Sequence, residues 1–412
     1  MKMYRLLCAA ALALALSLPA AGQQAKSPEI QRLEQMLQAA PDHGGLWLAM
    51  ATAQAKAGNK VEAFQWLEKA VDRGLDFDLP DESPAKAAFA ELREMPGMKE
   101  LLARAAVSNR RVVNRGRVAF RIPEKDLIPE GIAHDPETGA FYVGSLYKRK
   151  IVRIDKAGKT SDFTTSGQDG LWDLLGLKVD PARRTLWACS GAGPSAGELD
   201  GTSSLFRYNL ATGKFVGRYD LPGRPHLCND IALGKDGELF FTDSKGGILY
   251  RLRPQDAEYR METLVGSGTF IYPNGLAISP DLGKLFVADF KKGLSIVDVA
   301  TGQVRPLPHP ERVHIAGIDG LYFHRGSLLA VQNSAGTERV VRFRLNAALD
   351  AIESEEVLES RNPLFDIPTT GVLVGGALAV IANSQLDSVD GHGHLKPGVE
   401  LAEPVILEIP VE

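Results

Sequence analysis

The sequence repeats one local pattern six times after residue 115. In each unit a short apolar run follows the anchor residue, a turn comes next, and a second apolar run ends the pair. The clearest copy is Ile271–Asp289, where Leu276–Ile278 and Leu285–Ala288 flank the turn Pro280–Gly283. The six anchor residues lie 45 to 54 positions apart: Glu130, Leu175, Asn229, Asn274, Asp319 and Thr370.

A third strand-like run follows each pair, as at Ile151–Ile154 and Ile248–Leu252. Repeats of this length with about four short strands each are typical of β-propeller blades. Val118–Phe120 and Val405–Ile409 are expected to share one blade and close the ring. We therefore predict a mainly β fold, with a six-bladed β-propeller over residues 116–412.

Residues 26–107 show helical periodicity instead and have few strand formers. Their large and small residues match one tetratricopeptide-like unit, with helices at Leu46–Ala57 and Lys60–Asp72 around a Gly58–Asn59 turn. Phe77–Ala105 resembles the partial helical pair that follows such a repeat. Because one unit cannot bury its own faces, we expect it either to cap the propeller or to bind a protein partner. The polar residues 108–115 are the predicted linker.

The N-terminus has the features of a secretory signal peptide. Lys2 and Arg5 precede the apolar run Leu6–Leu18 and the small residues of Pro19–Gly22, and this run is too short to span a bilayer. We therefore expect removal of residues 1–22, a periplasmic or secreted protein, and no membrane span. The formal net charge of −4 becomes more negative without the two basic residues, which argues against a nucleic-acid partner.

Two cysteines remain after residue 22, namely Cys189 and Cys228. A disulfide between them and a pair of buried free thiols are both compatible with the sequence. Their spacing does not match that of a redox motif.

The anchors are expected to converge, because the innermost strand of each propeller blade lines the central channel. Four of them carry oxygen donors: Glu130 and Asp319 are carboxylates, and Asn229 and Asn274 are amides. Oxygen donors without imidazole or thiolate suit Ca²⁺ best, then Mg²⁺ or Mn²⁺, with Zn²⁺ kept as a further candidate. Without a cation, the two carboxylates would raise each other's pKa. Gly275 is expected to let the backbone turn close beside the ion.

Four motifs occur in a fixed order around the anchors: Pro129-Glu130-Gly131, Asn229-Asp230, Pro273-Asn274-Gly275 and Asp319-Gly320. Together they resemble the gluconolactonase and senescence marker protein (regucalcin) family, and more distantly the paraoxonases. The resemblance covers about residues 116–410. It implies a metal-dependent hydrolase of lactones or related esters.

Residue by residue, the resemblance implies a catalytic site at the anchors. Glu130, Asn274 and Asp319 would hold the catalytic metal, and Asn229 would lie on or beside it and face the substrate. Asp319 would also be the general base that activates the attacking water, a role that suits a carboxylate near a polarised carbonyl. Asp319 and Asn229 are therefore the predicted catalytic residues. Asp230 is expected to orient the strand or a second ion.

The residues before Asn229 depart from this family pattern. Members with sugar-lactone activity tend to carry an arginine close before the Asn-Asp pair, where it binds substrate hydroxyls. Here Arg224 lies five positions before Asn229, and Leu227 and Cys228 adjoin it. Arg224 and His226 are the predicted substrate-binding residues, and the departure weakens the case for a sugar substrate.

Several other polar residues and one motif are not expected to belong to the active site. Asp243, Asp289, Asn333 and Asn383 end their second strands, so we expect them to cap turns. Gly193–Gly197 matches a nucleophile-elbow pattern, but it lies in a loop and not between a strand and a helix.

The sequence thus predicts an exported, divalent-metal-dependent hydrolase of a small-molecule lactone or related ester. The alternative is a non-catalytic propeller that binds or scaffolds a partner and holds a structural calcium ion. The altered residues before Asn229 and the appended helices favour that alternative. A strictosidine-synthase-like condensing enzyme shares the fold but would not explain four metal ligands.

Overall fold

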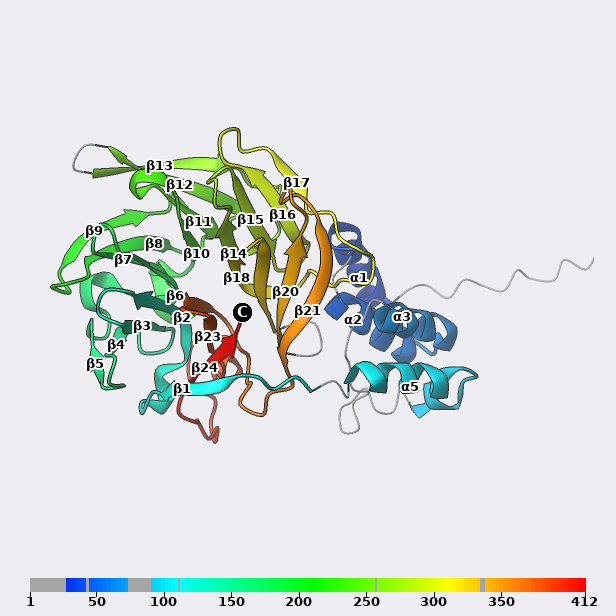
Figure 1. The fold of residues 1–412 in the computed structure, drawn as a ribbon. Helices are drawn as coiled ribbons and strands as arrows, with labels where there is room; N and C mark the ends of the chain where they lie inside the picture. Colours follow the sequence, from blue (N-terminus) through cyan, green and yellow to red (C-terminus); the bar gives the residue numbers. More distant parts are fainter. Residues whose placement is uncertain (1–26, 42–43, 73–89, 110–111, 256–257, 334–337) are drawn as a thin grey trace, which may run out of the picture.

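The chain folds into a six-bladed β-propeller with a layer of helices on one side (Figure 1). This computed structural model describes residues 27–41, 44–72, 90–109, 112–255, 258–333 and 338–412. The predicted signal peptide, residues 1–22, and part of the stretch Phe77–Ala105 lie outside the described residues. The prediction of a mainly β fold with a six-bladed propeller is confirmed.

Each blade is a four-stranded antiparallel sheet, and in five blades the strands follow one another in chain order. The first three blades contain β2 (Pro129–Asp135), β3 (Ala140–Ser145), β4 (Ile151–Ile154) and β5 (Thr160–Asp162), then β6 (Asp173–Asp180), β7 (Thr185–Gly191), β8 (Ser203–Asn209) and β9 (Phe215–Asp220), then β10 (Cys228–Leu233), β11 (Leu239–Asp243), β12 (Ile248–Gln255) and β13 (Glu258–Val265). The next two contain β14 (Pro273–Ile278), β15 (Lys284–Asp289), β16 (Gly293–Asp298) and β17 (Val304–Pro306), then β18 (Ile318–His324), β19 (Ser327–Gln332), β20 (Arg339–Leu345) and β21 (Ile352–Ser360).

The sixth blade closes the ring with strands from both ends of the propeller. It contains β22 (Gly371–Val374), β23 (Ala377–Ile381), β24 (Val405–Pro410) and β1 (Arg117–Arg121). β1 pairs antiparallel with β24, with Val118 opposite Leu407. The predicted closure is therefore confirmed, and it packs the sixth blade against the first, where Val143 and Ile381 share a buried cluster.

Neighbouring blades are held together by apolar cores. Six clusters of buried side chains each join two adjacent blades, as where Phe286 of β15 and Phe343 of β20 pack in one cluster. This arrangement follows from the near-continuous apolar runs of strands that are covered on both faces, such as β11 and β19, in which every residue is buried. The anchors are consequently held at the inner edge of a rigid ring.

Five of the inner strands share a β-bulge at the anchor residue. In β14, Pro273 pairs with Asp289 and Leu276 pairs with Val287, so two residues oppose one. The same shift occurs in β2, β6, β10 and β18. A bulge bends the strand and changes the direction of its side chains, and five of the anchors line a common cavity.

The glycine after an anchor allows adjacent blades to approach closely. A Cβ atom on Gly275 would overlap the carbonyl oxygen of Asp319, and one on Gly131 would overlap that of Leu175. The φ of Gly275 is not in the left-handed region, so no special backbone conformation requires the glycine. The neighbouring blade is what excludes a larger residue.

The helical layer has its own core. Its helices are α1 (Pro28–Ala39), α2 (Gly44–Lys56), α3 (Lys60–Asp72) and α5 (Met98–Asn109). α2 and α3 form a hairpin around Gly58, which has φ +78°, close to the predicted pair of helices. Trp47, Leu67 and Leu101 are buried together in a cluster separate from those of the blades. No helix among the described residues is long and apolar enough to cross a membrane.

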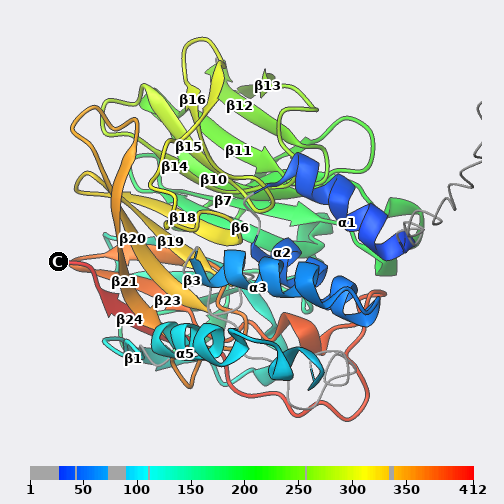
Figure 2. The same ribbon diagram turned by 90° about the vertical axis from the view of Figure 1, so that its right-hand side faces the viewer.

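The helical layer packs against the propeller (Figure 2). The ring of Trp47 in α2 lies edge-on to the ring of His314, which precedes β18, with 6.4 Å between centroids. α5 ends at Asn109, within the span predicted as a linker. Beyond it, the backbone N–H groups of Arg115 and Gly116 both donate to Glu359 at 2.8 Å. This connection is therefore bonded to β21.

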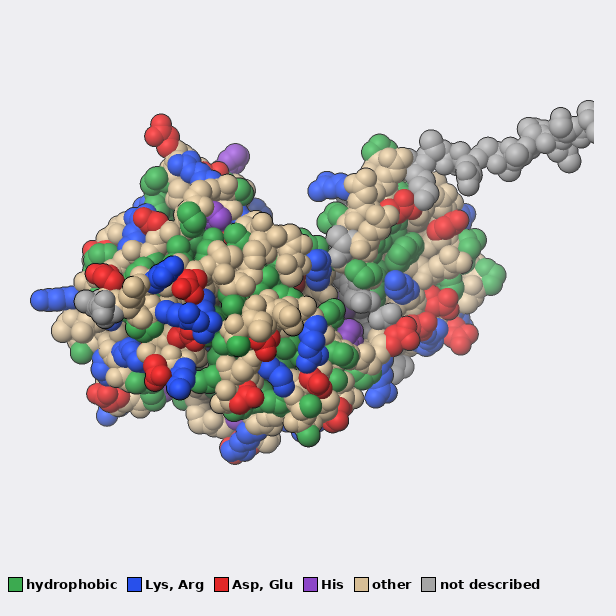
Figure 3. Space-filling model, turned by 90° about the horizontal axis from the view of Figure 1, so that it is seen from above, with side chains coloured by type: hydrophobic (Ala, Val, Ile, Leu, Met, Phe, Trp, Pro, Cys, Tyr) green, Lys and Arg blue, Asp and Glu red, His purple; other side chains and the backbone are tan. Residues whose placement is uncertain are grey.

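The surface has no dominant charge on the face seen from above. Basic and acidic side chains are interspersed there, and neither sign forms a continuous patch (Figure 3). This distribution agrees with the small negative net charge of the sequence.

Candidate functional site

The four predicted metal ligands lie together in the central channel. Glu130, Asn229, Asn274 and Asp319 all line one cavity of about 570 Å³. Their side chains are only 3% to 6% exposed. Leu175 lines the same cavity, so the second blade contributes an apolar side chain at the level where four other blades contribute oxygen donors.

Three oxygen atoms in this group are buried and accept no hydrogen bond within the described part of the chain. They are Glu130 Oε2, Asn229 Oδ1 and Asn274 Oδ1. A buried acceptor without a partner normally costs free energy. The donor set therefore fits an oxygen-preferring divalent cation such as Ca²⁺.

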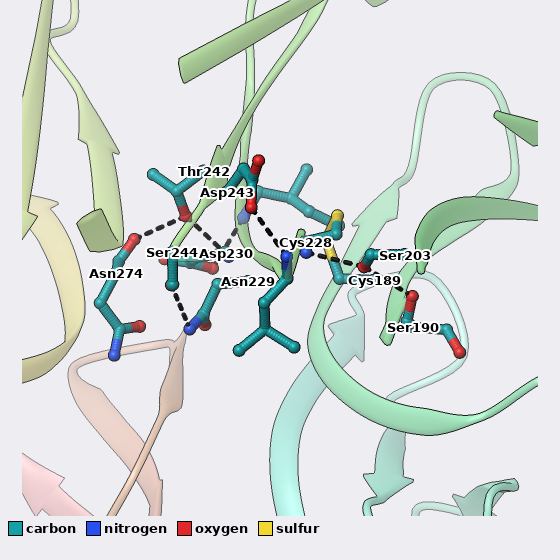
Figure 4. The surroundings of a disulfide bond; sticks show 12 residues. Cys189, Ser190, Ser203, Cys228, Asn229, Asp230, Thr242, Asp243, Ser244 and Asn274 are labelled. Atoms are coloured by element: carbon teal, nitrogen blue, oxygen red, sulfur yellow. Dashed lines mark hydrogen bonds between the residues drawn. A yellow bond between two sulfur atoms is a disulfide. The ribbon is translucent and has the colours of Figure 1, made fainter. Parts of the chain in front are cut away.

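Hydrogen bonds hold the amides with their carbonyl oxygens free. Asn229 Nδ2 donates to Ser244 Oγ at 2.9 Å, and that hydroxyl donates to the carbonyl of Pro273 at 2.6 Å (Figure 4). Asn274 Nδ2 donates to Asp319 Oδ1 at 2.9 Å. Because each NH₂ group is occupied in this way, each carbonyl oxygen is the end available to a cation.

Asn333, at the end of the second strand of the fifth blade, also belongs to the site. Its Nδ2 donates to Asp319 Oδ2 at 2.7 Å and to the carbonyl of Pro368 at 3.0 Å. Asp319 thus accepts one amide hydrogen bond on each oxygen, which fixes the plane of the carboxylate. Each oxygen keeps a further lone pair for a cation or a water molecule.

Both carboxylates of the ring have raised pKa values in the absence of a cation. Burial raises the pKa of Glu130 well above its usual range, with Asp319 and Asp230 adding to the effect. Burial also raises the pKa of Asp319 to about 6, while the hydrogen bonds from Asn333 and Asn274 oppose that rise. A divalent cation would favour the ionised forms of both groups.

Asp230 is buried beside the ring but serves the backbone. Its Oδ1 accepts from the N–H of Ile231 and its Oδ2 from the N–H of Leu276, both at 2.8 Å. Asp230 therefore joins the third blade to the fourth, at the position where other blades have glycine. Within the described residues, no three His, Cys, Asp or Glu side chains form a metal-binding group, so a cation here depends on the amides.

The predicted substrate-binding residues, Arg224 and His226, do not line the cavity. His226 is buried, and its Nδ1 lies 2.5 Å from Asp243 Oδ2 and its Nε2 2.9 Å from the carbonyl of Pro222. Both ring nitrogens are thus engaged, one by the end of β11 and the other by the loop before β10. Arg224 is exposed on the same loop. We therefore assign neither residue to the cavity.

The cavity walls come from residues that the sequence did not single out. Leu146, Leu227, Phe290 and Ile367 supply apolar surface. Burial raises the pKa of Tyr272 to about 12, and the nearby Asp319 and Glu130 contribute, so its hydroxyl stays protonated. Further polar lining comes from Asp173, Lys245, Lys291 and Asp387.

The two cysteines form a disulfide directly beside Asn229 (Figure 4). Cys189 of β7 and Cys228 of β10 have Cα atoms 5.1 Å apart. The bond joins the second strand of the second blade to the innermost strand of the third blade. Of the two alternatives that the sequence left open, the structure contains the disulfide.

Two of the expected turn caps behave as predicted. Asp243 accepts from the N–H groups of Leu227 at 2.7 Å and Gly246 at 3.0 Å. Asp289 accepts from Lys291 and Ile271 in the same way. Asn333 occupies the equivalent strand end but turns toward Asp319. Asn383, also an amide at such a strand end, bonds Glu403 and Val405 instead, so residue type alone does not distinguish these roles.

Comparison with known proteins supports the fold. No protein-family model matches the sequence, and a search of curated proteins finds no match. Among solved structures, a gluconolactonase from Xanthomonas campestris shares 18% identity at a TM-score of 0.50, over 73% of this chain and 97% of that one. The PQQ-bound aldose sugar dehydrogenase from Streptomyces coelicolor shares 19% identity at a TM-score of 0.49, over 72% and 97%. At such identities the similarity establishes the propeller fold alone.

Proposed function

We propose that this protein is an exported, divalent-cation-dependent hydrolase of lactones or related carboxylic esters. The observation that carries the proposal is the set of three buried oxygens that accept no hydrogen bond from the described residues; together with Asp319, their side chains line a cavity of about 570 Å³. That volume suits a small molecule. The disulfide fits a protein of an oxidising compartment.

The residues that would hold the cation are Glu130, Asn229, Asn274 and Asp319. We propose Ca²⁺ as the ion, with Mg²⁺, Mn²⁺ and Zn²⁺ as alternatives. A bound cation of this kind supplies a Lewis acid that polarises the carbonyl group of an ester. The two carboxylates would balance its charge, and four protein ligands would leave coordination positions for water and substrate.

Asp319 is the proposed general base. The amides of Asn274 and Asn333 fix its two oxygens, so it can accept a proton from an attacking water without reorienting. The hydrogen bond from Asn229 to Ser244 orients the side-chain carbonyl oxygen of Asn229. Asn229 would thus act together with the other three metal ligands at the carbonyl group of the substrate. The apolar walls would exclude other water from the reaction.

A binding or scaffold propeller with a structural calcium ion remains the second candidate. The placement of Arg224 and His226 outside the cavity favours it, because the residues expected to bind substrate do not reach the site. The helical layer would then serve as the docking surface for a protein partner.

A panel of lactones and aryl esters, assayed with and without EDTA and after Ca²⁺ is added back, tests the proposal. We expect turnover that EDTA abolishes and Ca²⁺ restores, and a loss of at least about 100-fold in Asp319→Asn. Glu353→Gln, an exposed carboxylate-to-amide change on the outer strand β21, is the matched control. If no substrate is hydrolysed while EDTA lowers the melting temperature, the structural-ion candidate replaces the enzyme.

A further inference from the structure

The cavity has a second level above the donor ring. Asp173, Leu227 and Tyr272 lie two positions before the anchors of the second, third and fourth blades, and all three line the cavity; Asp173 is in the same strand as its anchor, β6. Two residues of an extended strand span about 7 Å, which is comparable to the width of a small lactone. Of these three residues, Asp173 is the acidic one.

Asp173 and the proposed base stand on opposite sides of the channel. Asp173 belongs to the second blade and Asp319 to the fifth, and blades three places apart in a ring of six face each other. Below Asp173 the second blade presents Leu175, which has no oxygen donor. A substrate whose carbonyl meets the ring therefore has room for its alkoxy portion over Leu175, beneath the Asp173 carboxyl group.

The surroundings of Asp173 leave its carboxyl group available to the cavity. Gly193 lines the cavity next to Asp173, and a Cβ atom added to it would lie 3.1 Å from Asp173 Oδ2, so the glycine leaves room for the carboxyl group there. Burial raises the pKa of Asp173 to about 6, against the opposing influence of Arg149 and Lys245. Arg149 is itself held over the ring of Trp172, 4.8 Å from its centroid. A fraction of the group is thus protonated near neutral pH.

We propose that Asp173 is the general acid that protonates the leaving alkoxy oxygen, an assignment that rests on the proposed function. Water attacks the carbonyl carbon from the side of Asp319, which takes one proton. The bond between that carbon and the alkoxy oxygen then breaks, and the oxygen leaves with the electron pair and takes the proton of Asp173. Solvent reprotonates Asp173 and removes the proton from Asp319. The net reaction adds one water to one ester.

The requirement for an acid depends on the leaving group, which gives a direct test. An alkyl lactone expels a basic alkoxide, whereas a 4-nitrophenyl ester expels a stable phenolate that needs no proton. We expect Asp173→Asn, assayed in the Ca²⁺-loaded protein, to lose at least about 100-fold in kcat on the lactone. Its kcat on 4-nitrophenyl acetate should stay within about threefold of wild type, and that rate also shows that the variant is folded.

Asp173→Glu, which keeps the acid, should recover part of the lactone rate, and Glu353→Gln should match wild type on both substrates. Equal losses on the two substrates, or no loss on either, would overturn the role of Asp173 while leaving the metal-dependent hydrolase intact. If the wild-type protein hydrolyses neither substrate, the proposed function fails, and the role of Asp173 fails with it.

Discussion

The polar residues at the ends of the second blade strands have different roles here, because their side chains and their neighbours differ. Asp289 ends β15 and accepts N–H groups of its own turn. Asn333 follows β19 at the matching place, yet its amide reaches Asp319 in the channel. An amide offers two donor hydrogens where a carboxylate offers none. Of these two residues, only Asn333 can therefore donate a hydrogen bond to an acidic metal ligand.

We expect Asn333→Ala to weaken Ca²⁺ binding about 10- to 100-fold, because a ligand that loses its orienting hydrogen bond binds a metal less tightly. Isothermal titration with Ca²⁺ measures this directly, without any substrate. Asn383→Ala is the matched control, since Asn383 bonds Glu403 and Val405 of its own blade. Equal Ca²⁺ affinity in Asn333→Ala and wild type would remove Asn333 from the site.

Neighbouring blades are joined by specific polar links as well as by apolar cores. Asp135, at the end of β2, is fully buried and pairs with Arg184 in the turn between β6 and β7. Two nitrogens of the guanidinium group donate to the two carboxylate oxygens, at 2.6 and 2.9 Å. The hydrogen bond from Arg184 is the main cause that lowers the pKa of Asp135 to about 2.

This link predicts a pH-dependent stability. A carboxylate with a lowered pKa stabilises the fold above its unfolded pKa of about 3.9, and loses that contribution as the pH falls toward 2. We expect Asp135→Asn to lower the free energy of unfolding by about 2 kcal/mol at pH 7 and by about half as much at pH 3. Urea denaturation at the two pH values measures both differences.

The control for this link is Glu137→Gln. Glu137 also lies near Arg184, at 3.3 Å, but its side chain is 68% exposed. An exposed ion pair contributes little to stability, so this variant should unfold like wild type at both pH values. A pH-independent loss in Asp135→Asn would show that the packing of its side chain, and not its charge, stabilises the two blades.

The whole molecule combines two separately cored parts that meet at a defined contact. The buried cluster around Trp47 contains helical residues, and the blade clusters contain propeller residues. Trp47 also reaches across to His314. A second cavity, lined by Met36 and Leu46 of the helices and by Lys291 of the propeller, lies at the same junction, and Lys291 also lines the proposed active site.

We expect Trp47→Ala to destabilise the helical layer by about 3–5 kcal/mol, because it removes a fully buried aromatic ring. Calorimetry should show an unfolding transition of the helices at lower temperature while the propeller transition stays in place. Trp66→Ala is the matched control, since the Trp66 ring is only partly buried against the same cluster, and its effect should be smaller. A single transition that shifts as a whole would mean that the two parts unfold together.

The repeats alone were enough to predict the propeller, its closure and the four oxygen donors. Strand periodicity and the anchor register are local patterns, and the ring geometry converts an equal register into proximity. The equal register therefore predicted that Glu130 and Asp319 lie close together, although they are far apart in the chain.

The tertiary structure was needed to identify the roles of residues that depend on contacts between segments remote in sequence. Close packing against the Asp319 carbonyl of the neighbouring blade requires a glycine at position 275. The loop before β10 turns His226 toward Asp243, and Asn333 joins the site because its blade places it beside Asp319. These choices depend on distances between residues remote in sequence, because a side chain takes the partner that packing brings within hydrogen-bond reach.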